Sequence, residues 1–315
     1  MKPVIETQGL KKYFPTAYGM LHAVDDVTIT IEKGRTLGVV GESGCGKSTL
    51  GRTIIHLLER TDGKIFLHGE DISDVSGKQL RAAREKMQIV FQDPYSSIDP
   101  RKTIEYTIKE PLAVSKRYKR REIDELTTEL MELVGIDNRL RLSYPHELDG
   151  GRRQRVGIAR ALALQPDFIV CDEPVSALDV SIQAQVLNLL KRLQQQRGLA
   201  YMFVTHDLSV VRHISDDICV MYLGQVVELC PSKELFKNPL HPYTKALLSA
   251  IPSIDIHNPS TPEILEGELS SPINPKPGCR FIPRCKYATD ECHQPQEQTE
   301  VSPGHFVRCC RLGQI

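Results

Sequence analysis

The chain has 315 residues, enough for about two domains of roughly 150 residues each. Lys plus Arg number 40 and Asp plus Glu number 40, so the formal net charge is zero. A broad nucleic-acid-binding face needs surplus Lys and Arg to neutralise phosphates, so this balance argues against one. No apolar run approaches the roughly 20 residues that span a bilayer. The N-terminus has no apolar signal core, so we expect a cytosolic chain.

Strand and helix patterns alternate along the first 235 residues. Alternating apolar and polar residues at 22–24 and 27–31 predict strands, and the continuously apolar run 36–40 predicts a strand buried on both faces. Further strands are expected at 65–67, 89–91, 168–171 and 201–204. Helices are expected at 50–58, at 123–133 before Gly135, and at 182–193 with an end at Gly198, and 93–165 is mainly helical. Strands that alternate with helices predict an α/β fold with a mainly parallel sheet.

The chain changes character beyond about residue 235. Prolines recur there, and we expect an irregular extension instead of a second doubly wound domain. Nine cysteines occur in all, and five of them fall in the last 37 residues: Cys279, Cys285, Cys292, Cys309 and Cys310. In a reducing compartment a disulfide framework is not expected, so this crowd of cysteines indicates a metal site.

A phosphate-binding motif follows the strand expected at 36–40. Residues 41–48 read Gly-Glu-Ser-Gly-Cys-Gly-Lys-Ser and fit the pattern G-x-x-x-x-G-K-[ST] between a strand and a helix. Glycines there let successive backbone N–H groups turn inward as an anion-binding nest, with a helix N-terminus behind them. We expect Lys47 to reach the β- and γ-phosphates of a nucleotide and Ser48 to ligate Mg²⁺.

Two acids follow the buried strand at 168–171. Asp172 is placed to hold Mg²⁺ through water, and Glu173 to polarise an attacking water. His206 comes just past the next strand, where it can contact a γ-phosphate or that water. The alternative for Asp172 and Glu173 is a carboxylate pair that only caps the strand, and the alternative for His206 is a structural histidine.

These residues, in this order, resemble the ATP-binding-cassette (ABC) ATPases. The resemblance covers about residues 1–235 and implies a P-loop cassette. Its parts are a RecA-like parallel sheet core, an antiparallel β subdomain and a helical subdomain inserted at about 93–165. The extension would then occupy 236–315.

The resemblance assigns a role to each motif. Glu173 is the expected catalytic base, His206 the switch histidine and Gln92 the Q-loop glutamine that touches Mg²⁺ and water, with Ser48 and Asp172 as the other Mg²⁺ contacts. Tyr13 is the candidate aromatic for stacking on adenine, with Phe14 and Tyr18 as rivals. The ATP-binding Walker A loop comprises Gly41, Glu42, Ser43, Gly44, Cys45, Gly46, Lys47, Ser48 and Thr49. The D-loop comprises Ser176, Ala177, Leu178 and Asp179.

The signature motif departs from the family pattern of Leu-Ser-Gly-Gly-Gln. It reads here Leu148, Asp149, Gly150, Gly151 and Arg152. In the family's nucleotide-bound dimer the serine hydroxyl meets the partner's γ-phosphate, whereas an ionised Asp149 offers no hydroxyl and repels phosphate. Two interpretations stay open together. Asp149 is a good helix N-cap whose charge Arg152 offsets, and the chain works in a heterodimer with two unequal ATP sites.

Three runs narrow the resemblance, at 91–101, 174–181 and 238–244. Together they resemble the F-type ATP-binding subunits of dipeptide/oligopeptide importers. That resemblance implies an ATPase at the cytoplasmic face of the membrane. Its partners would be a second ABC ATPase, two membrane permeases and an extracellular or periplasmic binding protein, with no nucleic acid. Nickel, glutathione or another small solute is the alternative cargo, and a soluble non-transport ABC ATPase the alternative class.

The tail cysteines fit the same resemblance. Cys279, Cys285, Cys292 and Cys309 match a four-cysteine pattern that in this subfamily holds a [4Fe–4S] cluster. Thiolates suit either an iron–sulfur cluster or tetrahedral Zn²⁺, and the spacing alone does not decide between them. Cys310 is an alternative to Cys309, and a metal-free tail also stays open. A structural role is favoured over redox catalysis, because a proline-broken tail has little core of its own.

Overall fold

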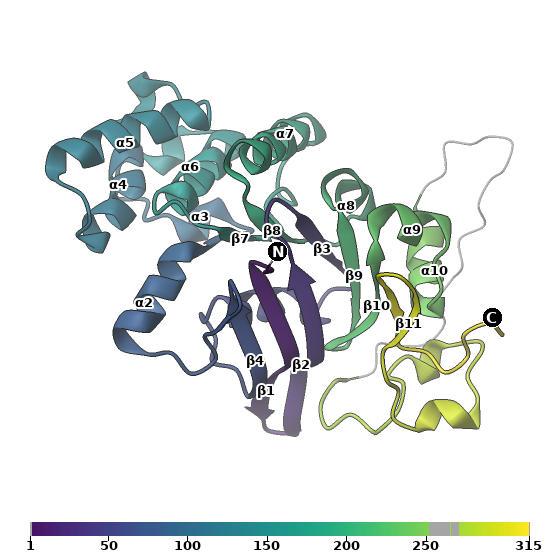
Figure 1. The fold of residues 1–315 in the computed structure, drawn as a ribbon. Coiled ribbons are helices and arrows are strands. Elements are labelled where there is room, and N and C mark those ends of the chain that lie inside the picture. The colour runs from purple at the N-terminus through teal and green to yellow at the C-terminus, as the bar shows by residue number, and fades with distance from the viewer. Residues whose placement is uncertain (1, 252–264, 266–270, 315) are drawn as a thin grey trace, which may run out of the picture. The chain divides into compact units, whose positions relative to one another are not determined.

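The computed structural model describes residues 2–251, 265 and 271–314, apart from the side chains of Pro94 and Ser96 (Figure 1). Parts of the expected extension, 252–264 and 266–270, therefore lie outside the described residues. The chain divides into two compact units. The helical unit is built from 1–5, 31–35 and 67–202, and the sheet unit from 6–30, 36–66 and 203–315. Within the described part of the chain, none of the helices has both the length and the apolar character needed to cross a membrane.

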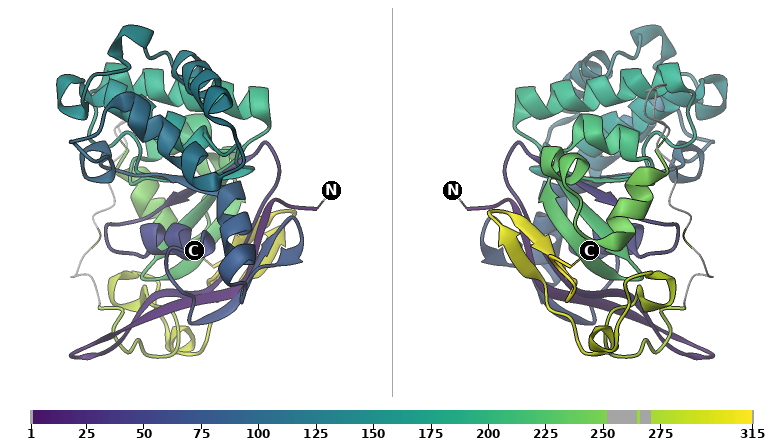
Figure 2. Two further views of the ribbon diagram at one scale, coloured as in Figure 1. Left: turned by 90° about the vertical axis from the view of Figure 1, so that its left-hand side faces the viewer. Right: turned by 90° about the vertical axis from the view of Figure 1, so that its right-hand side faces the viewer.

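The helical unit holds the helices expected between 93 and 165, which gather in one group (teal in Figure 2). Its main elements are β5 (Glu70–Asp71), α2 (Gly77–Lys86), β6 (Met87–Val90), α3 (Pro94–Ser97), α4 (Ile104–Ser115), α5 (Arg120–Leu133), α6 (Gly150–Leu162), β7 (Phe168–Asp172) and α7 (Val180–Arg197). Strands β6 and β7 pair in parallel, with Met87 opposite Phe168. Every residue of β7 is buried, as its continuously apolar sequence predicts.

The sheet unit contains two groups of strands. Its elements are β1 (Ile5–Thr16), β2 (Gly19–Ile31), β3 (Thr36–Val40), α1 (Lys47–Ile54), β4 (Asp62–Leu67), α8 (Leu208–Ile214), β9 (Asp217–Tyr222), β10 (Gln225–Pro231), α9 (Ser232–Lys237), α10 (Pro242–Ser249), β11 (Thr299–Ser302) and β12 (His305–Val307). Strand order is β2-β1-β4 in one group and β11-β12-β10-β9-β3 in the other. Pairing is parallel between β3 and β9 and antiparallel from β9 through β10 and β12 to β11. Strand β8 (Ala200–Val204) runs across the division between the units.

Several expected elements are confirmed with shifted ends. The two strands expected at 22–24 and 27–31 form the single strand β2. The helix expected at 50–58 begins earlier, at Lys47, and ends at Ile54. His56 follows with a φ of 58°, a left-handed conformation that helix α1 cannot include. Helix α7 ends before Gly198, whose φ of 64° suits glycine at a helix C-terminus.

The extension is more regular than expected, because it adds a helix and a hairpin to the sheet unit. The hairpin of β11 and β12 (yellow in Figures 1 and 2) lies along β10, with Val307 opposite Glu228. Glu228 is fully buried, and its carboxylate accepts the N–H groups of Leu240 and His241 at 2.9 Å and meets His305 Nε2 at 2.8 Å. A buried carboxylate needs such partners, so Glu228 fastens both the hairpin and the start of α10 to β10.

An aromatic cluster joins the extension to the end of β3. Tyr222 of β9 meets Tyr243 of α10 and Phe281 edge-on, with ring centroids 4.7 and 5.2 Å apart. Val40, the last residue of β3, belongs to the same buried core. The extension therefore packs within the sheet unit, next to the point where β3 leads into the phosphate-binding motif.

Candidate nucleotide-binding site

The loop between β3 and α1 has the backbone that the phosphate-binding motif requires. Gly41 has a φ of 148°, and a Cβ added there would lie 2.2 Å from the Met221 carbonyl oxygen. Gly46 has a φ of 102°, and its Cβ would lie 1.9 Å from the Ala23 carbonyl oxygen. Only glycine fits these two positions, since the conformation and the close backbone approach both exclude a side chain. The motif therefore forms a tight loop that leads directly into the N-terminus of α1.

Lys47 folds back over this loop. Its ammonium group donates to the carbonyl oxygens of Gly41 at 2.8 Å and Glu42 at 2.9 Å, and its side chain is buried. The cation thus lies at the anion-binding loop with backbone oxygens as its partners. A nucleotide phosphate can exchange for those oxygens, because phosphate offers the stronger charge-assisted hydrogen bonds. This is the placement that the motif predicts for the lysine.

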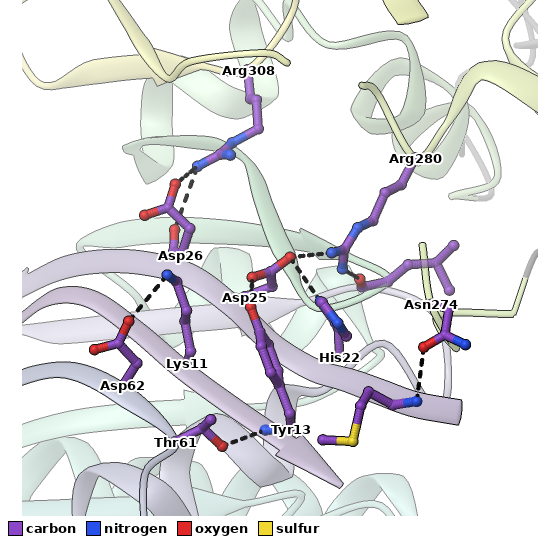
Figure 3. Close-up of polar contacts among 12 residues, drawn as sticks. Lys11, Tyr13, His22, Asp25, Asp26, Thr61, Asp62, Asn274, Arg280 and Arg308 are labelled. Carbon is purple, nitrogen blue, oxygen red and sulfur yellow. Dashed lines mark hydrogen bonds and ion pairs between the residues drawn. The ribbon is translucent and has the colours of Figure 1, made fainter. Parts of the chain in front are cut away.

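Tyr13 takes part in a polar network on the strands β1 and β2 (Figure 3). Its ring stacks on His22 with centroids 3.8 Å apart, and its hydroxyl donates to Asp25. Burial and the hydrogen bond to Asp25 raise the pKa of Tyr13, so the phenol stays protonated. Of its two rivals, Phe14 lies under the Lys12 ammonium group and Tyr18 is 85% exposed. The adenine-stacking role of Tyr13 stays a prediction.

His206 lies in the short connection between β8 and α8. Thr205, just before it, donates its N–H to the Val39 carbonyl oxygen at 3.2 Å, and Asp207, just after it, caps α8. The imidazole is exposed. Its backbone is therefore fixed on both sides, while the side chain remains accessible to a ligand.

The helical unit brings together two residues of the predicted catalytic set, Gln92 and Glu173, with Ser176 of the D-loop. Gln92 follows β6, and its amide nitrogen donates to Glu173 Oε2 at 2.9 Å and lies 3.5 Å from Ser176 Oγ. Ser176 in turn donates its hydroxyl to the Glu173 carbonyl oxygen at 3.1 Å. Asp172, at the end of β7, is 1% exposed. The Q-loop glutamine, the candidate base and the D-loop serine therefore form one connected group.

Sequence reasoning missed the residue that holds the D-loop turn. The side-chain amide of Gln183, in the first turn of α7, donates to the carbonyl oxygens of Val175 and Leu178, each at 3.0 Å. Asp179 caps the same helix by accepting the N–H of Ile182. A polar residue on an early helical turn is too common a feature to have indicated this role.

The structure confirms the capping interpretation of the signature motif. Asp149 is the N-cap of α6 and accepts the N–H of Arg152 at 2.7 Å, and the Arg152 guanidinium lies 3.4 Å from the same carboxylate. Gly151 has no room for a side chain, since a Cβ there would lie 2.4 Å from Ile182. Leu148 is buried and its carbonyl oxygen accepts from Arg153 at 2.9 Å. The motif is thus a helix start with an acid in the serine's place.

The tail cysteines line one small pocket of the sheet unit. The five thiols belong to Cys279, Cys285, Cys292, Cys309 and Cys310. Burial raises the pKa of Cys279 to about 12 and raises that of Cys309 in the metal-free chain, and a metal that binds these sulfurs would displace their protons. The N–H of Thr289 lies 3.5 Å from the Cys292 sulfur, and Phe281 and Arg311 supply main-chain hydrogen bonds to Cys279 and Cys309. Such donors stabilise thiolates that bind a metal, so the pocket fits a thiolate-bound metal group.

Comparison with known proteins identifies the family. The ABC transporter family model matches residues 24–176, and the model of the oligopeptide/dipeptide transporter C-terminal region matches residues 227–292. The oligopeptide transport ATP-binding protein AppF of Bacillus subtilis is 51% identical, over 97% of this chain and 96% of its own length. The chain belongs to the ABC transporter family of ATPases. The dipeptide transport ATP-binding protein DppF of Haemophilus influenzae is 46% identical, over 98% of this chain and 97% of its own.

Solved ABC ATPases share the fold. CbiO1 of Clostridium perfringens, part of the ABC transporter complex cbiONQ, has a TM-score of 0.68 and 27% identity over 76% of this chain and 92% of its own. A dimeric ATP-binding cassette in a post-hydrolysis state, bound to ADP and Pi, has a TM-score of 0.67 and 28% identity over 72% of this chain and 98% of its own. Family membership implies membrane permeases as partners and dimerisation of the ATPase subunits. The roles of single residues in this ABC ATPase stay predictions.

Proposed function

We propose that this ABC ATPase powers an importer of dipeptides or oligopeptides from the cytoplasmic face of the membrane. The observation that carries the proposal is the match of the extension, at 227–292, to the oligopeptide/dipeptide transporter C-terminal region. Relatives named for oligopeptide and dipeptide transport align over nearly the whole chain, which adds support. The partners would be a second ABC ATPase, two permeases and an external binding protein.

Each predicted site residue has a chemical task in the hydrolysis of ATP. Lys47 leaves the carbonyl oxygens of Gly41 and Glu42 and pairs with the β- and γ-phosphates of the incoming nucleotide. By the family resemblance, Ser48, Asp172 and Gln92 would hold Mg²⁺, which would offset the charge of the phosphates.

Hydrolysis itself falls to the group around the candidate base. Glu173 takes a proton from the attacking water. Gln92 lies 2.9 Å from the Glu173 carboxylate and orients that carboxylate. His206 contacts the γ-phosphate. ATP binding and phosphate release would then close and reopen the dimer and switch the permeases between access states.

Substitution of the candidate base tests this assignment. In the complex with permeases and partner ATPase, Glu173→Gln removes the proton acceptor but keeps the shape, and we expect ATP hydrolysis at this chain's site to fall by about 100-fold or more. Glu129→Gln, at an exposed position of α5, is the matched control and keeps full activity. Peptide bound to the external binding protein is expected to stimulate the intact complex. Unchanged hydrolysis in Glu173→Gln would reject the assignment, and stimulation by nickel or glutathione alone would reject the peptide cargo.

We further propose that the cysteine pocket holds a [4Fe–4S] cluster, with Cys279, Cys285, Cys292 and Cys309 as its ligands. The group would staple together a part of the chain that has little core of its own. Among the described residues, the group of three ligand atoms that lie within 4.8 Å of one another is Glu228, Cys230 and His305, and the tail thiols form no such group. The Cys292 and Cys310 sulfurs lie 3.6 Å apart, a separation that two sulfurs on a single Zn²⁺ would also have, since Zn–S bonds are about 2.3 Å. The four-cysteine pattern of the subfamily, and not the distances between the thiols, favours the cluster over the zinc alternative.

Metal analysis of cysteine variants tests the cluster. The purified full-length chain is expected to be brown and to contain iron and acid-labile sulfide, and Cys285→Ser or Cys309→Ser removes both. Cys310→Ser is the matched control in the same pocket and keeps them. A colourless protein with stoichiometric zinc contradicts the proposal. Loss of iron in Cys310→Ser but not in Cys309→Ser would replace Cys309 as the fourth ligand.

A further inference from the structure

The extension contacts the phosphate-binding loop directly, through one residue of that loop. Arg284 donates two parallel hydrogen bonds to the Glu42 carboxylate, from Nη1 to Oε2 at 2.8 Å and from Nη2 to Oε1 at 3.1 Å. Their side chains are 8% and 23% exposed. This two-pronged geometry fixes direction as well as distance, because the planar guanidinium matches both carboxylate oxygens at once.

A second residue of the extension holds the backbone of the same loop residue. The Glu42 N–H donates to the Tyr243 hydroxyl at 2.9 Å, and Tyr243 is fully buried in α10. The Glu42 carbonyl oxygen accepts from Lys47. When Lys47 turns to a nucleotide, the bonds to Arg284 and Tyr243 can persist, because Lys47 contacts the Glu42 carbonyl oxygen, whereas Arg284 and Tyr243 contact its carboxylate and its N–H. The extension is therefore hydrogen-bonded to the phosphate-binding loop through both the side chain and the backbone of Glu42.

Arg284 is itself held firmly. It ends the short 3₁₀ helix Ile282–Arg284 and is followed by Cys285, which lines the cysteine pocket. Phe281 packs edge-on against Tyr222 in the aromatic cluster. Arg280 pairs with Asp25 and also donates to the Leu223 carbonyl oxygen (Figure 3). The residues just before Arg284 are thus anchored in the sheet unit, and the two bonds to Glu42 fix the orientation of the Arg284 guanidinium.

We propose that Arg284 is a positioning residue for ATP binding, which acts through Glu42 to hold residues 41–46 in the shape that receives the phosphates. The proposal makes the extension part of the nucleotide site, beyond its role as the holder of a metal group. A pair that only fastened the tail would affect stability and leave ATP affinity unchanged. These two roles therefore differ in what an arginine variant does to the binding of Mg·ATP.

The test measures the dissociation constant for Mg·ATP of the full-length chain, without cargo or hydrolysis, so it does not depend on the proposed peptide cargo. Arg284→Met keeps the aliphatic part of the side chain and removes the guanidinium. We expect the dissociation constant for Mg·ATP to rise about ten-fold, or ~1.4 kcal/mol. Glu42→Gln is expected to have a similar effect. The double variant should bind no more weakly than either single one, because both remove the same contact. In the assembled complex, KM for ATP rises while kcat is retained, the pattern for lost uniform binding.

Arg308→Met is the matched control. Arg308 is another tail arginine, and it pairs with Asp26 on β2 at 3.0 Å (Figure 3). Its side-chain hydrogen bonds go to Asp26 and to the Gln296 carbonyl oxygen instead of the phosphate-binding loop. Its loss is expected to lower the unfolding temperature without nucleotide as much as Arg284→Met does, and to leave ATP affinity unchanged. Normal ATP affinity in folded Arg284→Met overturns the proposal, as does equal weakening by Arg308→Met. If Arg284→Met fails to fold, Glu42→Gln decides, and unchanged affinity in that variant overturns the proposal.

Discussion

Glu173 has a φ of 47°, a left-handed conformation that costs a non-glycine residue roughly 1–3 kcal/mol. Ser176 helps to hold it there, since the Ser176 N–H and hydroxyl both donate to the Glu173 carbonyl oxygen. The turn directs the carboxylate to Gln92 at 2.9 Å. The acid after a buried strand could be predicted from the sequence, but its unusual backbone could not, because no residue type there requires a left-handed turn.

The role of Tyr13 can be tested at the same scale. Tyr13→Phe keeps the ring and loses the hydrogen bond to Asp25, whereas Tyr13→Ala loses both. If the ring stacks on adenine, Tyr13→Ala weakens ATP binding by about 1–3 kcal/mol and Tyr13→Phe by much less. Affinities from fluorescence titration with Mg·ATP provide the measurement.

Inorganic tripolyphosphate is the control ligand for Tyr13, because it carries the phosphates without the base. Its affinity is expected to stay the same in both variants. Equal losses of ATP affinity in Tyr13→Phe and Tyr13→Ala would assign the effect to the network of Asp25 and Arg280 instead of stacking. A loss in Tyr18→Ala that matches Tyr13→Ala would transfer the stacking role to that rival.

At the scale of elements, the sequence analysis predicted several of the buried strands and helices but missed the strands β1, β9 and β10. The buried strands β3 and β7 are continuous apolar runs, and α7 has capping Asp179 at one end and Gly198 at the other. Strand β11 was missed because all four of its residues are exposed, so that no alternation of apolar and polar residues marks it. Its place follows instead from β12, which pairs with β10.

The hairpin of the extension depends on a contact that sequence patterns do not reveal. His305 of β12 meets Glu228 of β10 at 2.8 Å across 77 residues of chain. Nothing in the sequence links a histidine and a glutamate so far apart, and a glutamate alone is expected at the surface. The prolines of the extension predicted an irregular segment. Its last strands are regular because this buried pair holds β12 against β10.

At the scale of the whole molecule, some parts of the site are continuous sequence motifs, and others are contacts between residues far apart in the sequence. The Walker A loop, the acids after β7 and the D-loop are short continuous runs, so the chemistry each requires can be predicted from neighbouring residues. The bond of Arg284 to Glu42 joins residues 242 positions apart, and the sequence gives no reason to pair them. The family resemblance located the motifs, and only the fold shows that the extension reaches one of them.

The signature of this chain belongs to the whole assembly, because in a dimer of ABC ATPases it would complete the partner's ATP site. We predict that Asp149→Ser raises ATP hydrolysis at that site by about ten-fold, since a hydroxyl donor to the γ-phosphate replaces a repelling carboxylate. Serine is also a good N-cap, so helix α6 should keep its start. The measurement is the residual ATPase rate of the complex in a Glu173→Gln background, which silences this chain's own site.

Asp149→Asn separates the two reasons for the weak site. Asparagine caps the helix as aspartate does and removes the charge, but it supplies no hydroxyl. A rise in Asp149→Asn equal to that in Asp149→Ser would assign the defect to charge repulsion, and a rise in serine alone would assign it to the missing donor. An unchanged residual rate in both variants would contradict unequal sites set by this residue. Arg152 lies 3.4 Å from the Asp149 carboxylate, and in that case it already neutralises the charge at the partner's phosphate.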